Sequence, residues 1–161
     1  EKTLNLSTAF MLKNYLQQFG FEVLMTRTKD VFIPLNKRAS MANEQNPLLF
    51  VSVHYNSAPS PEAEGVEVYY YKKGENKKRI KESQALAQAV LNRVISNTHA
   101  RSRGVKHGNY AVVRETTMPA ILIEGGFLTN ANELQKIKSA EYLKKLALGI
   151  AQGINDYVDQ E

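Results

Sequence analysis

Cysteine is absent from the 161-residue sequence. Its absence excludes disulfides, thiolate zinc sites and cysteine nucleophiles, so any chemistry must depend on oxygen and nitrogen groups. No stretch approaches the roughly 18 apolar residues of a membrane-spanning helix, and no signal peptide is visible. Internal repeats and low-complexity linkers are also missing. Because the sequence opens at Glu1 without a methionine, we expect the natural protein to have residues upstream of it.

The composition is that of one folded domain over residues 1–161. A hydrophobic content of 43% is enough for a real core and argues against extensive disorder. The formal charge is +5, from 21 Lys and Arg against 16 Asp and Glu. This modest excess fits an ordinary surface with a basic bias, and it equally fits attraction to a polyanion. Charge alone does not decide between the two.

The spacing of apolar residues predicts an alternation of helices and strands. Helices are expected over residues 4–19, 35–42, 80–95, 132–137 and 142–158. Strands are expected over residues 21–26, 48–54, 66–71, 110–114 and 120–124, with loops over 57–64 and 101–109. Such alternation predicts an α/β three-layer sandwich, in which a mostly parallel mixed sheet has helices on both faces.

Two of the predicted core strands end in a residue that can carry chemistry. His54 follows the apolar run 48–53, and Glu124 follows Ile121-Leu122-Ile123. A carboxylate in that position is costly to bury without a partner or a metal ion. Gly125-Gly126 then allows a sharp turn and a close approach to a ligand. If the two strands are parallel, both side chains lie at the same edge of the sheet, where α/β proteins bind ligands.

These residue types are suited to zinc chemistry, although a structural histidine and a buried ion pair remain alternatives. A neutral imidazole and carboxylates can bind zinc, and an open coordination position can hold a water whose pKa the metal lowers. A further carboxylate could accept the proton of that water and pass it to a leaving amine. Hydrolysis of an amide needs both the activated water and the proton transfer, but these residues do not identify the substrate.

Short motifs along the whole chain, in a consistent order, carry a family resemblance. They are Glu1–Leu6, Thr26-Arg27 with Asp30, Leu35–Arg38 with Ala42-Asn43, Val51–Asn56, Gly65–Tyr70, Arg103–Lys106, Val113-Arg114, Met118–Ala120 and Ile123–Asn130. Together they resemble the zinc-dependent N-acetylmuramoyl-L-alanine amidases of the amidase 3 family. The resemblance implies hydrolysis of the amide between N-acetylmuramic acid and L-alanine in peptidoglycan by a zinc-activated water.

The resemblance also implies roles for particular residues. Glu1 and His54 would bind Zn²⁺, and Glu124 would be the catalytic carboxylate that acts on the zinc-bound water. The family's first strand ends in Asp-Pro-Gly-His-Gly and supplies a third ligand, but the present sequence has no such segment, and we expect it in the natural protein. His99 and His107 lie in polar stretches and are interpreted as surface or loop residues. Supporting or structural roles are expected for four further residues: Arg27, Arg38, Asn56 and Glu67.

Two other functions remain as hypotheses. A non-catalytic peptidoglycan-binding or regulatory relative would fit an incomplete zinc site. A nucleic-acid-binding domain would fit the net charge, but the basic run Lys72–Lys81 lacks the interleaved aromatic residues of a binding motif, and we expect no nucleic-acid partner. An enzyme acting on peptidoglycan is expected to be an exported bacterial protein of the cell wall or periplasm, and we expect a monomer.

Overall fold

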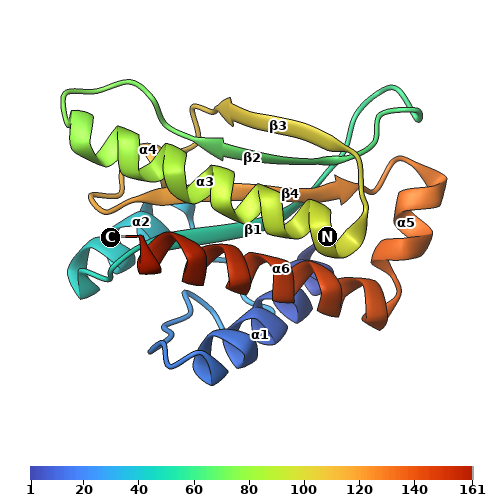
Figure 1. The fold of residues 1–161 in the computed structure, drawn as a ribbon, viewed down its shortest axis with the longest axis horizontal. Coiled ribbons are helices and arrows are strands. Elements are labelled where there is room, and N and C mark those ends of the chain that lie inside the picture. The colour runs from blue at the N-terminus through green and yellow to red at the C-terminus, as the bar shows by residue number, and fades with distance from the viewer. Residues whose placement is uncertain (161) are drawn as a thin grey trace.

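The computed structural model describes residues 1–160, which fold around one four-stranded sheet (Figure 1). The strands are β1 (Phe50–Asn56), β2 (Val66–Tyr70), β3 (Ser102–His107) and β4 (Ala120–Phe127), and their order is β1-β4-β2-β3. β1 is parallel to β4 and β2 is parallel to β3, whereas β2 and β4 are antiparallel. The sheet is therefore mixed and mostly parallel, as predicted.

Helices cover both faces of the sheet. They are α1 (Lys2–Gln18), α2 (Leu35–Gln45), α3 (Lys77–Thr98), α4 (Ala111–Arg114), α5 (Ala131–Ile137) and α6 (Ala140–Asp159). α1, α3 and α6 lie on one face, and the shorter α2 and α4 lie on the other (Figure 1). This arrangement confirms the three-layer α/β prediction. No helix in the described part of the chain is both long and apolar enough to span a membrane.

The main core lies between the sheet and the face formed by α1, α3 and α6. The strand residues that point into it include Val66, Val68, Ile121 and Ile123, all of which are fully buried. α3 and α6 pack closely against each other, so that a Cβ atom added at Gly153 would clash with the Cα of Val90. The opposite face of the sheet is covered only in part and carries the polar residues described below.

The prediction of a strand over residues 21–26 is wrong. These residues run without strand pairing and are separated from β1 by a groove, so no neighbouring strand completes a hydrogen-bonded ladder with them in the described structure. Within residues 1–160, β1 is an edge strand, because β4 is its only neighbour in the sheet.

Two further predictions are wrong for different reasons. Residues 101–109 were expected to form a loop, but Ser102–His107 is β3, an edge strand with charged side chains on one face. Residues 110–114 were expected to form a strand, but 111–114 form α4, whose Val112 and Val113 pack against Leu122. An apolar run this short does not distinguish a strand from a helical turn.

β4 also continues past the glycines that were expected to end it. His54 pairs with Glu124, whereas Asn56 pairs with Phe127, so β4 carries an extra residue at this point and forms a bulge. Gly126 has a φ of 141°, which glycine adopts without strain. A Cβ atom at Gly125 would lie 2.8 Å from Tyr55, so this glycine permits close packing inside the protein.

Candidate metal and catalytic site

The two strand residues singled out from the sequence lie side by side. β1 and β4 are parallel, and the Cα atoms of His54 and Glu124 are register partners near the carboxyl ends of both strands. On the other side of β4, Glu124 pairs with Glu67 of β2. Register partners point to the same face of a sheet. The side chains of His54, Glu67 and Glu124 therefore lie on the incompletely covered face of the sheet.

Glu1 completes this group from the start of α1. Its Oε1 atom lies 3.9 Å from Nδ1 of His54. Two ligands of one tetrahedral zinc ion are separated by about 3.3 Å, so a small adjustment would let both bind one ion. The other ring nitrogen, Nε2, lies 2.9 Å from Oγ of Ser52. A hydrogen bond at that nitrogen fixes the ring orientation, as outer partners of metal-binding histidines do.

The surroundings favour the neutral form of His54. Burial is the largest cause that lowers the pKa of His54, and the positive charge of Arg38 lowers it further, while Glu1 acts in the opposite direction. Arg27 donates a hydrogen bond from Nη2 to the carbonyl oxygen of Lys2 at 3.1 Å, which anchors the start of α1 beside Glu1. The neutral imidazole is the form that binds metal ions.

Glu124 is buried and incompletely hydrogen-bonded. Only 9% of the residue is exposed, and its Oε2 atom has no hydrogen-bond partner in the described structure. Burial raises the pKa of Glu124 to about 8, and the negative charges of Glu1 and Glu67 contribute to the increase. A buried carboxyl group with a free oxygen and a strongly perturbed pKa is typical of functional sites.

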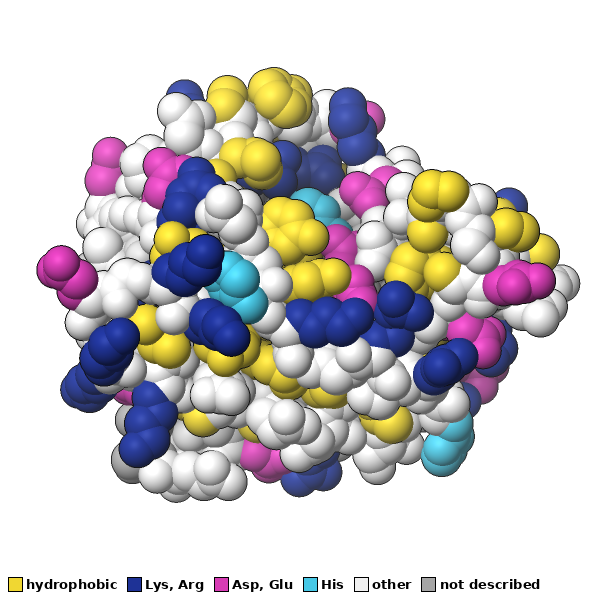
Figure 2. All heavy atoms as spheres, turned by 90° about the horizontal axis from the view of Figure 1, so that it is seen from above, with side chains coloured by type: hydrophobic (Ala, Val, Ile, Leu, Met, Phe, Trp, Pro, Cys, Tyr) yellow, Lys and Arg dark blue, Asp and Glu magenta, His cyan; other side chains and the backbone are white. Residues whose placement is uncertain are grey.

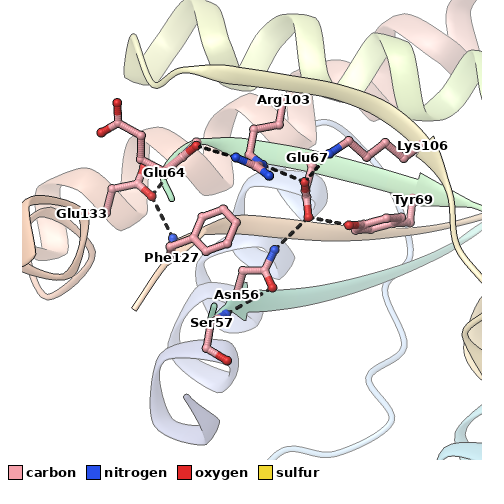
Figure 3. A network of polar contacts seen from close by, with 10 residues as sticks. Asn56, Ser57, Glu64, Glu67, Tyr69, Arg103, Lys106, Phe127 and Glu133 are labelled. Carbon is pink, nitrogen blue, oxygen red and sulfur yellow. Dashed lines mark hydrogen bonds and ion pairs between the residues drawn. The ribbon is translucent and has the colours of Figure 1, made fainter. Parts of the chain in front are cut away.

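Glu67 occupies the opposite situation, at the centre of a saturated hydrogen-bond network (Figure 3). Its Oε2 accepts from Nδ2 of Asn56 at 2.8 Å and from the hydroxyl of Tyr69. Its Oε1 accepts from Nε of Arg103 at 2.9 Å and from Nζ of Lys106 at 2.8 Å. Despite the opposing effect of burial, these hydrogen bonds and the charge of Lys106 lower the pKa of Glu67 to about 2.

The network includes residues that the sequence analysis did not single out. Ser52, Tyr69, Arg103 and Lys106 were not identified as candidates, whereas Asn56 and Glu67 received only a general supporting role. The alternation along 66–70 was the available signal, because it places Glu67 and Tyr69 on the same face. Arg103 is also held by Phe127, whose ring centroid lies 4.8 Å from the guanidinium carbon.

The donor set fits zinc in kind and brings together two potential ligands, Glu1 and His54. Among residues 1–160, no group of three or more His, Cys, Asp or Glu side chains is placed to hold a metal ion. The other histidines lie elsewhere. His99 is the C-cap of α3, and His107 ends β3, where its ring stacks near Tyr71 and its Nδ1 accepts from the backbone N–H of Lys72.

A groove of about 700 Å³ runs along the free edge of β1, next to His54. Residues 20–27 form its other wall, and apolar side chains of α1, including Leu12 and Leu16, contribute to its lining. The groove therefore separates the unpaired edge of β1 from the unpaired segment 20–27.

Comparisons with known proteins show the family of the chain and agree with its fold. The family model Amidase_3, described as N-acetylmuramoyl-L-alanine amidase, matches residues 1–156. The chain is 32% identical to N-acetylmuramoyl-L-alanine amidase LytC of Bacillus subtilis (strain 168) over 157 residues, which cover 98% of this chain and 31% of LytC. It therefore spans less than a third of that relative.

Solved structures of amidases superpose closely on the fold. An N-acetylmuramoyl-L-alanine amidase from Clostridium difficile 630 is 40% identical with a TM-score of 0.94, and the match covers 100% of this chain and 85% of that one. The catalytic domain of CwlV, an N-acetylmuramoyl-L-alanine amidase from Bacillus (Paenibacillus) polymyxa var. colistinus, is 36% identical with a TM-score of 0.90. That match covers 100% of this chain and 86% of the other.

Proposed function

This chain belongs to the Amidase_3 family of N-acetylmuramoyl-L-alanine amidases, and we propose that it hydrolyses the amide between N-acetylmuramic acid and L-alanine in peptidoglycan with the aid of zinc. The observation that carries this proposal is that Glu1 lies close to His54, while His54 and Glu124 are register partners on the open face of the sheet. Because peptidoglycan is a bacterial wall polymer, the natural protein would act outside the cytoplasm, in the wall or periplasm.

Glu1 and His54 are the residues that would hold the zinc ion. The distance of 3.9 Å between Oε1 of Glu1 and Nδ1 of His54, the neutral state of the imidazole and the hydrogen bond between Nε2 of the ring and Oγ of Ser52 support this assignment. When bound, the ion would supply a Lewis acid that polarises the scissile carbonyl and lowers the pKa of a water molecule.

Glu124 would carry the proton in the reaction. Its unpartnered Oε2 can accept the proton of the attacking water, whose oxygen forms a bond to the carbonyl carbon. The carbon–nitrogen bond then breaks, and Glu124 returns the proton to the nitrogen of L-alanine. The products are the lactyl carboxylate of the sugar and a free amino group on the peptide. Burial raises the pKa of Glu124, which helps its carboxyl group to hold the proton between the two steps.

A third ligand is needed, because catalytic zinc sites use three protein ligands and an open position. We propose, as the family resemblance implies, that this ligand is a histidine on a strand that fills the groove beside β1. The free edge of β1, the apolar lining of the groove and the presence of His54 in its wall support this assignment. Residues 1–161 would then be the remainder of a single amidase catalytic domain.

The test is release of stem peptides from purified peptidoglycan by the natural protein loaded with zinc. We expect new peptides whose first residue is L-alanine. Glu124→Gln should retain zinc but lose about 1000-fold in rate, whereas His54→Ala should lose the metal. Glu141→Gln, at a side chain that is 81% exposed, is the control and should retain both properties. Absence of peptide release by the zinc-loaded wild type would refute the proposal.

A non-catalytic peptidoglycan-binding protein is the second candidate. It is favoured by one observation, namely that residues 1–160 bring together fewer than three potential metal ligands. Binding to peptidoglycan without bound zinc and without peptide release would support this candidate over the amidase.

A further inference from the structure

Two cations on β3 surround a single buried carboxylate. Nζ of Lys106 and Nε of Arg103 lie 2.8 and 2.9 Å from the same Oε1 atom of Glu67 (Figure 3). Glu67 carries one negative charge and the two cations carry one positive charge each, so the cluster has a formal excess of one positive charge. Glu67 therefore does not neutralise both cations.

The donors that Glu67 leaves unused are accessible. The side chain of Lys106 is 39% exposed and that of Arg103 is 31% exposed, compared with 3% for Glu67. An ammonium group has three N–H donors, and Glu67 accepts from one of those of Lys106. In the view from above, acidic side chains and a histidine lie near the middle of the visible face with Lys and Arg side chains beside them (Figure 2). The spare donors can thus bind an anion that approaches this face.

The cations lie close to the proposed proton carrier. Glu67 and Glu124 are register partners on neighbouring antiparallel strands, whose paired Cα atoms are about 5 Å apart. Because Nζ of Lys106 reaches Glu67, its spare donors lie roughly one strand away from Glu124. An extended dipeptide spans about 7 Å, so a substrate group within two residues of the scissile bond can reach them.

We infer that Lys106, assisted by Arg103, binds a carboxylate of the peptide on the leaving side of the scissile amide. This inference rests on the proposed function. On the sugar side, the carboxyl group of muramic acid is itself part of the scissile amide, and the remaining groups are neutral. On the peptide side, the residue after L-alanine is a glutamate joined through its side-chain carboxyl, which leaves its main-chain carboxylate free unless it is amidated.

The assignment gives the substrate a direction across the sheet. The peptide crosses β2 towards β3, where Lys106 and Arg103 lie. The sugar then occupies the opposite side, over β1 and the start of α1. Amidation of the glutamate carboxylate, which removes its negative charge, should weaken binding without changing the scissile bond.

The test compares two ligands that differ in one group. Both are N-acetylmuramoyl-L-alanyl-γ-D-glutamyl-L-lysine, one with the main-chain carboxylate of glutamate and the other with a carboxamide. Binding is measured calorimetrically in the presence of a chelator, so that no turnover occurs. The variants are Lys106→Met, the charge-preserving Lys106→Arg, and Lys144→Met, which removes an exposed charge from α6 on the far face.

We expect the wild type to bind the carboxylate ligand about tenfold more tightly, which is about 1.4 kcal/mol. Lys106→Met should reduce this ratio to about twofold, while Lys106→Arg and Lys144→Met should preserve it. Equal binding of the two ligands by the wild type, an unchanged ratio in a folded Lys106→Met, or no measurable binding of either ligand would overturn the inference.

Hydrolysis separates this inference from the proposed function. If the zinc-loaded protein cleaves both ligands while binding them equally, the carboxylate site is refuted and the amidase activity stands. If it prefers the carboxylate ligand but cleaves neither, the carboxylate site stands and the amidase activity is refuted.

Discussion

Replacing Glu67 by glutamine should destabilise the protein, and the effect should depend on pH. Glutamine preserves the shape of the side chain but removes its charge. Glu67 accepts all four of its hydrogen bonds. The amide nitrogen of glutamine is a donor and cannot accept, so it would lie opposite other donors. The change therefore leaves Lys106 and Arg103 without their shared counter-ion.

The magnitude follows from the displaced pKa. A decrease from 4.5 to about 2 corresponds to about 3 kcal/mol of stability at neutral pH. The two cations are partly exposed, at 31% and 39%, so water can solvate them when the carboxylate is lost. We therefore reduce the expected loss for Glu67→Gln to about 2 kcal/mol.

The sign of the pH dependence is fixed by the direction of the shift. A carboxyl group whose pKa is lower in the folded state stabilises the protein above its unfolded value of 4.5, and this contribution is lost as pH falls towards 2. At pH 3, less than about half of the contribution should remain. The deficit of the variant relative to the wild type should shrink accordingly to less than about 1 kcal/mol.

Urea unfolding at pH 7 and at pH 3 measures this difference. Glu141→Gln is the matched control, because Glu141 is 81% exposed and pairs with Lys145 across a solvated surface. We expect its free energy of unfolding to stay within about 0.5 kcal/mol of the wild type. If Glu67→Gln is as stable as the wild type at pH 7, or if its deficit is equally large at pH 3, the account of the network is wrong.

Three other substitutions test separate features. Ser52→Ala should lower zinc affinity about tenfold in the natural protein, because it removes the hydroxyl that orients His54, and a metal titration measures this. Gly153→Ala should lower the unfolding free energy by about 2 kcal/mol, because the new methyl group would clash with a backbone atom of α3, whereas Lys144→Ala should change it little. Arg79→Met should cost about 3 kcal/mol in thermal unfolding, because it strands two carbonyls and a hydroxyl that the guanidinium now bonds.

Much of the fold could be predicted from local patterns. The long helices and the strands β1, β2 and β4 follow from runs whose apolar spacing matches one kind of element. β3 could not be found in this way, because its exposed face carries Arg103 and Lys106 and reads as a polar loop. The carboxylate that pairs with both cations is Glu67, which lies more than 30 residues earlier in the sequence. The sequence close to β3 contains Arg103 and Lys106 but not the carboxylate with which they pair.

The pairing of β2 with β4 explains how two similar carboxyl groups in this site come to behave differently. Glu67 and Glu124 are register partners, so they share one face and one neighbourhood. Four donors saturate Glu67 and lower its pKa to about 2, whereas Glu124 keeps an unpartnered oxygen and has a pKa near 8. Strongly separated pKa values in adjacent carboxyl groups indicate separate roles in acid–base chemistry. Because four donors occupy the oxygens of Glu67, the unpartnered oxygen of Glu124 supports the proposal that Glu124 is the proton carrier of this pair.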